Sequence, residues 1–382
     1  MFLLDVLPYL YWCLFISYFI FILFLWIGFF RIPYRAVNNK LKASVIVPFR
    51  NESHNLVKCI ESTLNQDIER DRFEIILIDD HSSDDYFDRI KNLIKDNEIK
   101  LIKLNELEGK FGKKKAIAEG IKNSTNEIIV TTDADCWHDK KWLKSLLESF
   151  DENTGFVAGK IVYFNGKNFF EILQKIEFTS LVAIGASLIG NNYPLLANGA
   201  TCAYRKELYY KLGGFDDNIH LASGDEEFLM QKIWRETNYK VRFCFLPEST
   251  TYTLPIESIG KFINQRKRWV SKVPFYKNKF LLSILILLYL FYLSLLVNLL
   301  IAIIFGLYVK SLFFIYVIKT IIDSTFLING FNFLGVTKNV KEKLKLIILI
   351  PIAELFHLFY ITLVPIAGVF TGFNWKGREL RR

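Results

Sequence analysis

Residues 127–135 read Glu127-Ile-Ile-Val-Thr-Thr-Asp-Ala-Asp135, an apolar run that ends on two carboxylates. A run of this kind, rich in β-branched residues and bounded by polar ones, predicts a buried strand over 127–132. Similar apolar runs recur upstream, with helical stretches between them. We expect strands at 43–48, 74–79, 99–104 and 127–132, and helices at 54–65, 86–96 and 113–122. This alternation predicts an α/β domain built on a mainly parallel sheet.

Polar clusters follow three of the expected strands. They are Arg50-Asn51-Glu52, Asp79-Asp80 and Asp133-Ala134-Asp135. Ligands of open parallel sheets bind outside the carboxyl ends of the strands, so these clusters are expected to share one site. Asp133 and Asp135 can hold Mg²⁺ or Mn²⁺, with diphosphate oxygens completing the coordination shell. Aspartates spaced in this way also occur in ordinary turns, and the position after a buried strand favours the metal site.

The other two charged segments at this end each have two interpretations. Asp79 and Asp80 can accept hydrogen bonds from a nucleoside, whereas Ser83 or Asp84 can cap the following helix. The lysines at 113–115 open a helix, where anions are favoured over cations. They therefore indicate a role facing phosphate, although one or two of them can simply face solvent.

Membrane segments explain the high apolar content of the 382 residues, of which 52% are hydrophobic. The excess lies in 7–30 and in most of 279–373, whereas 31–278 has the composition of a soluble domain. Residues 7–30 are long enough to cross a bilayer. The residues before them include Asp5 and no basic residue, which indicates an uncleaved anchor rather than a signal peptide. Arg31 and Arg35 follow directly, so the positive-inside rule places the amino terminus outside and the following domain in the cytoplasm. With the further apolar segments near the carboxyl end, we expect a multi-pass protein of the plasma (inner) membrane.

The carboxyl-terminal part predicts about two to four transmembrane helices after a surface helix. Segments 280–308 and 312–328 are good spanning candidates, and 344–373, which contains Pro351 and Pro365, is either one tilted helix or a broken pair. The predicted domains are an anchor at 1–30, a catalytic domain at 31–254, an interfacial amphipathic helix at 255–278, a transmembrane region at 279–373 and a basic tail at 374–382.

The net charge of +9 favours a membrane surface and a phosphate-bearing substrate as partners, because no nucleic-acid-binding motif is present. The five cysteines lack CxxC spacing, which argues against a zinc site or a disulfide framework.

Together the motifs resemble those of the family 2 glycosyltransferases, inverting enzymes with a GT-A (Rossmann-like) nucleotide-sugar domain. The resemblance covers roughly residues 43–275. It implies donor contacts from Pro48, Arg50 and Glu52 on the uridine side, from the nucleoside pair Asp79 and Asp80, from Lys113 of the Gly112-Lys113-Lys-Lys-Ala116 helix start, and from the metal motif Asp133 and Asp135.

The acceptor half is similar as well. The segment 198–205 and Gly213-Gly-Phe-Asp216 resemble the lining of the family's acceptor site. Residues 223–229 resemble the acidic motif whose carboxylate deprotonates the acceptor hydroxyl. The family usually has Asp as the second acid, where this chain has Glu226. Alignment on the following helix assigns Glu226 as the base, and the preserved Asp assigns Asp225.

Gln265-Arg-Lys-Arg268-Trp269 fits the QxxRW motif of the cellulose, chitin and hyaluronan synthase-like members. Arg268 can pair bidentately with diphosphate oxygens, and Trp269 offers a flat face to a sugar. An interfacial helix also favours Trp and Arg without any such role.

The resemblance implies a metal-dependent inverting transferase that moves a sugar from a nucleotide diphosphate donor, a UDP-sugar, to a lipid-linked or glycan acceptor. Its expected partners are donor, acceptor and membrane lipids, with no nucleic acid, and a homo-oligomer or other envelope-glycan enzymes are further candidates. A processive synthase that also extrudes its polysaccharide is the alternative. A different class is a transporter or scaffold that only binds the nucleotide sugar, with Glu354 and His357 forming a polar path in the membrane.

Overall fold

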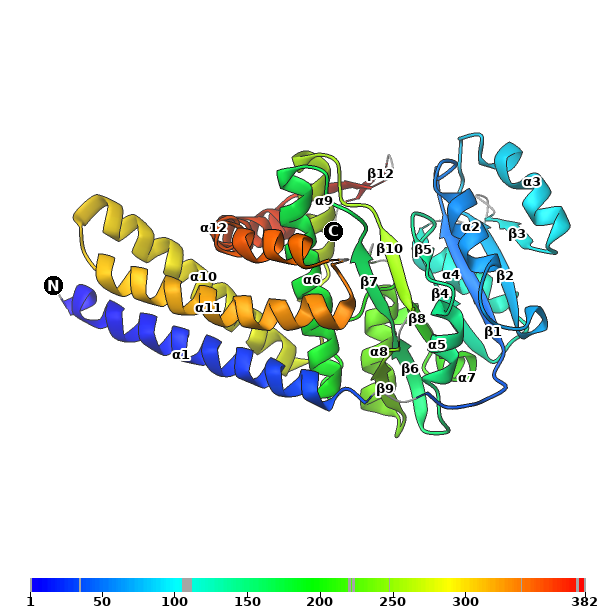
Figure 1. The fold of residues 1–382 in the computed structure, drawn as a ribbon, viewed down its shortest axis with the longest axis horizontal. Coiled ribbons are helices and arrows are strands. Elements are labelled where there is room, and N and C mark those ends of the chain that lie inside the picture. The colour runs from blue at the N-terminus through cyan, green and yellow to red at the C-terminus, as the bar shows by residue number, and fades with distance from the viewer. Residues whose placement is uncertain are drawn as a thin grey trace. The chain divides into compact units, whose positions relative to one another are not determined.

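The computed structural model describes residues 2–33, 36–104, 112–218, 221, 224–246, 248–337, 339–375 and 378–380 (Figure 1). The chain divides into two compact units. The helical unit comprises Met1–Ile27, Lys167–Ser180 and Ile256–Arg382. The sheet unit comprises Gly28–Gly166 and Leu181–Pro255.

A seven-stranded sheet with strand order β3-β2-β1-β4-β8-β6-β9 organises the sheet unit. Its strands are β1 (Ala43–Phe49), β2 (Phe73–Asp79), β3 (Lys100–Lys103), β4 (Ile128–Thr131), β6 (Thr154–Ala158), β8 (Cys202–Arg205) and β9 (Lys240–Phe243). Strand β8 runs antiparallel to both neighbours, and the other pairs are parallel. The mainly parallel sheet predicted from the sequence is confirmed.

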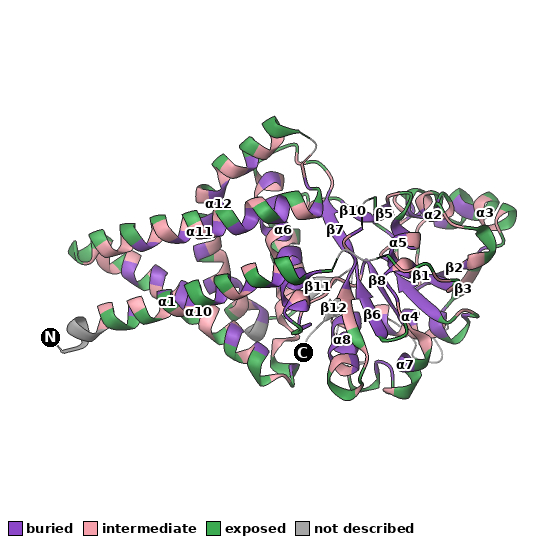
Figure 2. Cartoon of the chain, turned by 60° about the horizontal axis from the view of Figure 1, so that its bottom comes forward, coloured by how far each residue is buried: buried purple, intermediate pink, exposed green. Residues whose placement is uncertain are grey.

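Burial explains why the central strands are apolar. Every residue of β1 and β4 is buried, as expected for strands covered on both faces. Figure 2 shows this for β1. The helices of this unit are α2 (Leu56–Leu64), α3 (Tyr86–Asp96), α4 (Lys113–Lys122), α5 (Trp142–Glu148), α7 (Lys206–Lys211) and α8 (Asp225–Glu236). Helix α4 packs on β1 and β2. A smaller sheet has the order β5-β10-β7, formed by β5 (Trp137–His138), β7 (Lys160–Tyr163) and β10 (Thr250–Thr253).

The register brings the polar strand ends together. Phe49 at the end of β1 lies opposite Asp79 at the end of β2. The N–H of Asp80 donates to the carbonyl of Phe49 at 2.8 Å, and the N–H of Thr132 donates to the carbonyl of Ile46 at 3.2 Å. The clusters after β1, β2 and β4 therefore lie at one end of the sheet.

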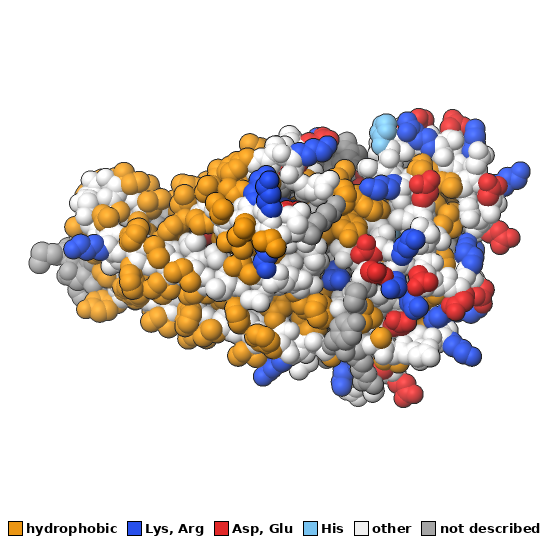
Figure 3. Space-filling view, in the orientation of Figure 1, with side chains coloured by type: hydrophobic (Ala, Val, Ile, Leu, Met, Phe, Trp, Pro, Cys, Tyr) orange, Lys and Arg blue, Asp and Glu red, His pale blue; other side chains and the backbone are white. Residues whose placement is uncertain are grey.

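Among the described residues, five helices are long and apolar enough to cross a membrane. They are α1 (Phe2–Arg31), α6 (Phe169–Gly190), α10 (Lys279–Phe305), α11 (Val309–Leu334) and α12 (Val340–Phe370). Hydrophobic side chains cover much of the surface over α1, α10 and α11 (Figure 3). Helix α12 is continuous across Pro351 and Pro365, so of the two interpretations of 344–373 the single helix is correct.

Helix α6 and a hairpin near the carboxyl end are additions to the elements expected from the sequence. Helix α6 was not expected, because Glu171, Lys175 and Glu177 interrupt its apolar pattern. The amphipathic segment forms α9 (Ile259–Val270). A hairpin of β11 (Phe373–Trp375) and β12 (Arg378–Leu380) follows α12, and the tail residues Lys376, Arg381 and Arg382 lie outside the described residues.

A buried ion-pair cluster joins three of the apolar helices. The ammonium of Lys319 on α11 lies 2.6 Å from Asp323 and also pairs with Glu354 on α12. The hydroxyl of Tyr18 on α1 donates to Asp323 at 2.7 Å. Glu354 thus takes part in an interhelical ion pair, which accounts for its presence in an apolar helix without a transport path.

Replacing Lys319 by Met is expected to destabilise the helical unit by about 3–5 kcal/mol, because Asp323 and Glu354 are then left buried without their cation. Chemical unfolding in detergent micelles measures this change. The exposed Lys310 at the start of α11 supplies the control, since Lys310→Met should change stability by less than about 0.5 kcal/mol. Equal stability of the two variants would contradict a stabilising role for the cluster.

Candidate active site

Asp79 and Asp80 are buried at the end of β2. The carboxylate of Asp79 accepts from the N–H of Ser82 and the hydroxyl of Tyr86, both at 2.8 Å. Asp80 accepts from the N–H of Gly112 at 3.0 Å, which ties β2 to the start of α4. Both carboxylates are therefore held in fixed orientations at the sheet end.

The prediction that Ser83 or Asp84 caps the helix after β2 is wrong. The N-cap residue of α3 is Asp85, not Ser83 or Asp84, and its side chain makes no capping bond. Asp84 instead accepts from the N–H of Ser53 at 2.8 Å, so this acid joins the loops that follow β1 and β2.

Hydrogen bonds join the loop after β1 to the loop after β2. A guanidinium nitrogen of Arg50 donates to the carbonyls of Asp80 and His81, each at 2.9 Å. Glu52 accepts from the side-chain amide of Asn55 at 2.8 Å, and Pro48 is buried within β1. Arg50 and Glu52 are thus placed beside Asp79 and Asp80 by local hydrogen bonds.

Asp133 and Asp135 lie just beyond β4. Asp135 is exposed and the Asp133 side chain is 37% exposed, so both carboxylates can reach a ligand. No group of three or more His, Cys, Asp or Glu suited to a metal ion occurs among the described residues. The pair therefore fits a hard cation only if the ligand supplies further oxygens, as a diphosphate does.

The start of α4 brings lysines against these acids. The ammonium of Lys113 lies 2.6 Å from Asp133 and 3.9 Å from Asp225, and that of Lys114 lies 3.8 Å from Asp225. Burial lowers the pKa of Lys113, but the neighbouring carboxylates outweigh burial and hold that pKa above its usual value. Two lysines held at the sheet end can contact a bound anion through charge-assisted hydrogen bonds.

Helix α8 begins with Asp225, Glu226 and Glu227, all of them buried, whereas Ser223 lies outside the described residues. Carboxylates in a first turn are favoured by the helix dipole. The Glu226 side chain is 2% exposed, and its Oε1 has no hydrogen-bond partner among the described residues. A Cβ on Gly199 would lie 2.0 Å from Glu226 Oε2, so a side chain at 199 would displace this carboxylate from its present position.

Burial, reinforced by the charges of Asp225 and Asp133 and opposed by Lys113, raises the pKa of Glu226 to about 7. A carboxyl group with a pKa near neutrality can take up and release a proton under ordinary conditions. Both acids that the sequence left open have a carboxylate oxygen without a hydrogen-bond partner among the described residues. They differ in that the pKa of Glu226 is raised to about 7, whereas Asp225 lies within 4 Å of the ammonium groups of Lys113 and Lys114.

Gln265, Arg268 and Trp269 lie on α9 of the helical unit, and their part in the donor site stays a prediction. The structure singles out Arg266 between them, which sequence reasoning missed. Arg266 is buried, its Nε donates to Glu177 of α6 at 3.0 Å, and its guanidinium carbon lies 4.1 Å from the ring centroid of Trp269. The available signal was the spacing of Phe262 and Trp269, which lie one helical turn before and after Arg266 on α9 and contact its guanidinium.

Comparison with known proteins matches residues 44–213 to Glycosyl transferase family 2. The probable glycosyltransferase YdaM of Bacillus subtilis (strain 168) is 26% identical over 254 residues, covering 63% of this chain and 57% of that protein. The poly-beta-1,6-N-acetyl-D-glucosamine synthase of Staphylococcus epidermidis is 26% identical over 231 residues, covering 59% of this chain and 53% of that protein. The chain thus spans about half the length of these curated relatives.

Among solved structures, the mannosyltransferase PcManGT from Pyrobaculum calidifontis in complex with GDP-Man and Mn²⁺ aligns with a TM-score of 0.55 at 16% identity. The alignment covers 93% of this chain and 97% of that one. At this identity the likeness concerns the fold alone, and it confirms the predicted GT-A architecture. The apolar helices expected at both ends are those found in this chain itself.

Proposed function

We propose, from the family 2 glycosyltransferase domain that residues 44–213 form, that the chain transfers a sugar from a nucleoside diphosphate donor to an acceptor hydroxyl at a membrane. The observation that carries the proposal lies outside the matched residues. The buried Glu226 carboxyl, with its orphaned Oε1, belongs to a cluster with the cations and acids at the sheet end. This cluster combines a proton acceptor with an anion-binding group.

In the proposed reaction the acceptor hydroxyl attacks the anomeric carbon in one displacement, which inverts the configuration. Glu226 takes the hydroxyl proton as general base. Asp225 holds Lys113 and Lys114 in place, and the lysines contact oxygens of the departing diphosphate. Asp79, Asp80, Arg50 and Glu52 surround the nucleoside, with uridine as the proposed base.

Asp133 and Asp135 are the residues that would hold Mg²⁺ or Mn²⁺, which when bound neutralises charge on the diphosphate. Three carboxyl groups lie around the two lysines Lys113 and Lys114, and Asp135 adds a fourth nearby. The three are those of Asp133, Asp225 and Glu226, so ionised carboxylates outnumber the lysines. A cation beside an anionic donor balances that excess. Gln265, Arg268 and Trp269 are proposed to complete the donor site.

The chain is proposed to act as a multi-pass protein of the plasma (inner) membrane with its sheet unit in the cytoplasm. The apolar helices α1, α10, α11 and α12 and the arginine that ends α1 support this topology. Helix α6 is not counted as a span, because segments of the sheet unit precede and follow it in the chain. The acceptor is then a lipid-linked sugar or a growing envelope glycan, and a homo-oligomer or other envelope-glycan enzymes are proposed partners.

A processive polysaccharide synthase is the second candidate. Similarity to a poly-beta-1,6-N-acetyl-D-glucosamine synthase and the apolar helices are the observations that support it. A non-catalytic transporter or scaffold has less support, because it gives the orphaned Glu226 oxygen no task.

The function is tested by incubating membranes that contain the chain with a panel of labelled nucleotide sugars and Mn²⁺, and then sizing the products. One added sugar supports single transfer, and a ladder or long polymer supports the synthase. Donor binding without transfer or hydrolysis for any member of the panel would support the scaffold instead.

The pH dependence of transfer should report Glu226. Because the base must be deprotonated, kcat/KM is expected to fall below a pKa of about 7, approaching tenfold per pH unit in the acidic limb. Asp225 raises the pKa of Glu226, so Asp225→Asn should move the limb to lower pH. A kcat/KM that stays flat from about pH 5 to pH 8 would contradict this assignment.

A further inference from the structure

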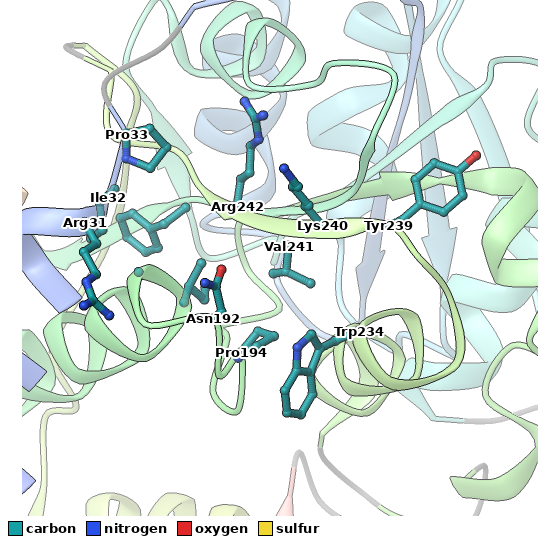
Figure 4. A pocket seen from close by; sticks show the side chains of 13 residues that line it. Arg31, Ile32, Pro33, Asn192, Pro194, Trp234, Tyr239, Lys240, Val241 and Arg242 are labelled. Atoms are coloured by element: carbon teal, nitrogen blue, oxygen red, sulfur yellow. The ribbon is translucent and has the colours of Figure 1, made fainter. Parts of the chain in front are cut away.

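A pocket of about 490 Å³ lies in the sheet unit, and none of its lining residues belongs to the candidate active site (Figure 4). Cationic, aromatic and amide side chains contribute to its lining. They include Arg31, Asn192, Trp234, Tyr239, Lys240 and Arg242.

The first wall is the close crossing of α1 and α6. A Cβ on Gly28 would lie 2.0 Å from the carbonyl oxygen of Ser187, and one on Gly190 would lie 2.1 Å from that of Gly28. Small residues allow this approach, which places Arg31 at the pocket rim. A guanidinium nitrogen of Arg31 donates to the side-chain oxygen of Asn191 at 3.3 Å.

The second wall is β9, which is the edge strand of the main sheet. Lys240 and Arg242 project from one side of β9 and Val241 from the other (Figure 4). Trp234 comes from α8 and packs edge-to-face on Tyr193, with ring centroids 5.9 Å apart. Strand, helix and ring contacts therefore give the pocket rigid sides.

The charge of the pocket is positive. Arg242 is paired with Asp151. Arg31 and Lys240 are exposed, and within the described part of the chain Arg31 bonds only the neutral amide of Asn191 while Lys240 has no ion pair. Two uncompensated cations among the residues that line one cavity favour an anionic ligand.

The position of the pocket relative to the bilayer indicates the source of that anion. Arg31 is the last residue of Leu7–Arg31, a 25-residue apolar segment long enough to span a bilayer. The end of such a segment lies at the level of the lipid headgroups, where Trp, Tyr, Lys and Arg are favoured. We propose that this pocket binds the phosphate of an anionic membrane lipid.

The test compares binding of phosphatidylglycerol and phosphatidylcholine with identical acyl chains to the purified full chain in detergent. Two nearby cations are expected to give a preference for phosphatidylglycerol on the order of tenfold or more. The double variant Arg31→Gln/Lys240→Gln should reduce the preference to within about twofold, because each cation contributes part of it. The pair Arg31→Lys/Lys240→Arg should retain it, which separates charge from folding.

The matched control is Lys95→Gln/Lys122→Gln, which removes the same charge from exposed positions of the sheet unit outside the pocket. The control should keep the preference of the unmodified chain. Equal losses in the two Gln pairs, or no preference at all in the unmodified chain, would overturn the proposal. Displacement of phosphatidylglycerol by millimolar inorganic phosphate, with phosphatidylcholine bound equally well, would identify free phosphate as the ligand and also overturn it.

Discussion

Glu226→Gln is expected to lower kcat for sugar transfer by about 10²–10⁴-fold, the usual contribution of a general base. The Gln side chain keeps the size of Glu226 and the room left by Gly199, but it cannot accept a proton near neutral pH. Donor affinity should stay within about threefold, because Glu226 is proposed to act on the acceptor hydroxyl and not to contact the donor. Initial rates at saturating donor, together with donor binding by calorimetry, measure the two quantities separately.

Asp225→Asn provides the matched comparison one residue away. Asp225 lies 3.9 Å from Lys113 and 3.8 Å from Lys114, so its loss should weaken donor binding more than it slows proton transfer. KM should therefore rise more than kcat falls in Asp225→Asn, with the reverse in Glu226→Gln. The opposite pattern would make Asp225 the base and Glu226 the positioning residue.

Asp135→Ala is expected to lower metal-dependent transfer by about a hundredfold or more, because one protein ligand of the proposed cation is removed. The Mn²⁺ concentration that gives half-maximal activity should rise, and excess Mn²⁺ should restore part of the activity. Asp135 is exposed and folding should be unaffected, which thermal unfolding checks.

The exposed Asp96 at the end of α3 supplies a control of equal charge. Asp96→Ala should leave both the rate and the Mn²⁺ requirement unchanged. An Asp135→Ala protein with the normal Mn²⁺ requirement would contradict a metal at this motif, whatever its overall rate.

The alternation of apolar runs and helices was sufficient to predict β1, β2 and β4 and the meeting of their polar ends. Such strands are buried on both faces, so their local sequence carries the signal without help from distant residues. The two long apolar segments at 280–308 and 312–328 were predictable for the same reason, since a membrane span is defined by local composition.

Features that depend on contacts between distant parts of the chain could not be predicted from the sequence. Residue types alone do not tell whether Glu226 or Asp225 meets the lysines, because α4 and α8 are more than a hundred residues apart in the chain. Helix α6 was missed because its charges look exposed until Glu177 is paired with Arg266. Arg31 was recognised as a topology signal, but its place in a pocket depends on the contact between Gly28 and Gly190.

The central claim, that Glu226 is the base of a nucleotide-sugar transferase, is tested most directly by measuring the release of nucleoside diphosphate from a panel of nucleotide sugars. Membranes that contain the unmodified chain are compared with membranes that contain Glu226→Gln, at equal amounts of folded protein. We expect at least one donor to be turned over by the unmodified chain in the presence of Mn²⁺ and an acceptor, with turnover lowered by about a hundredfold or more in the variant. Turnover at equal rates in both, or turnover of no donor by the folded unmodified chain, would contradict the account.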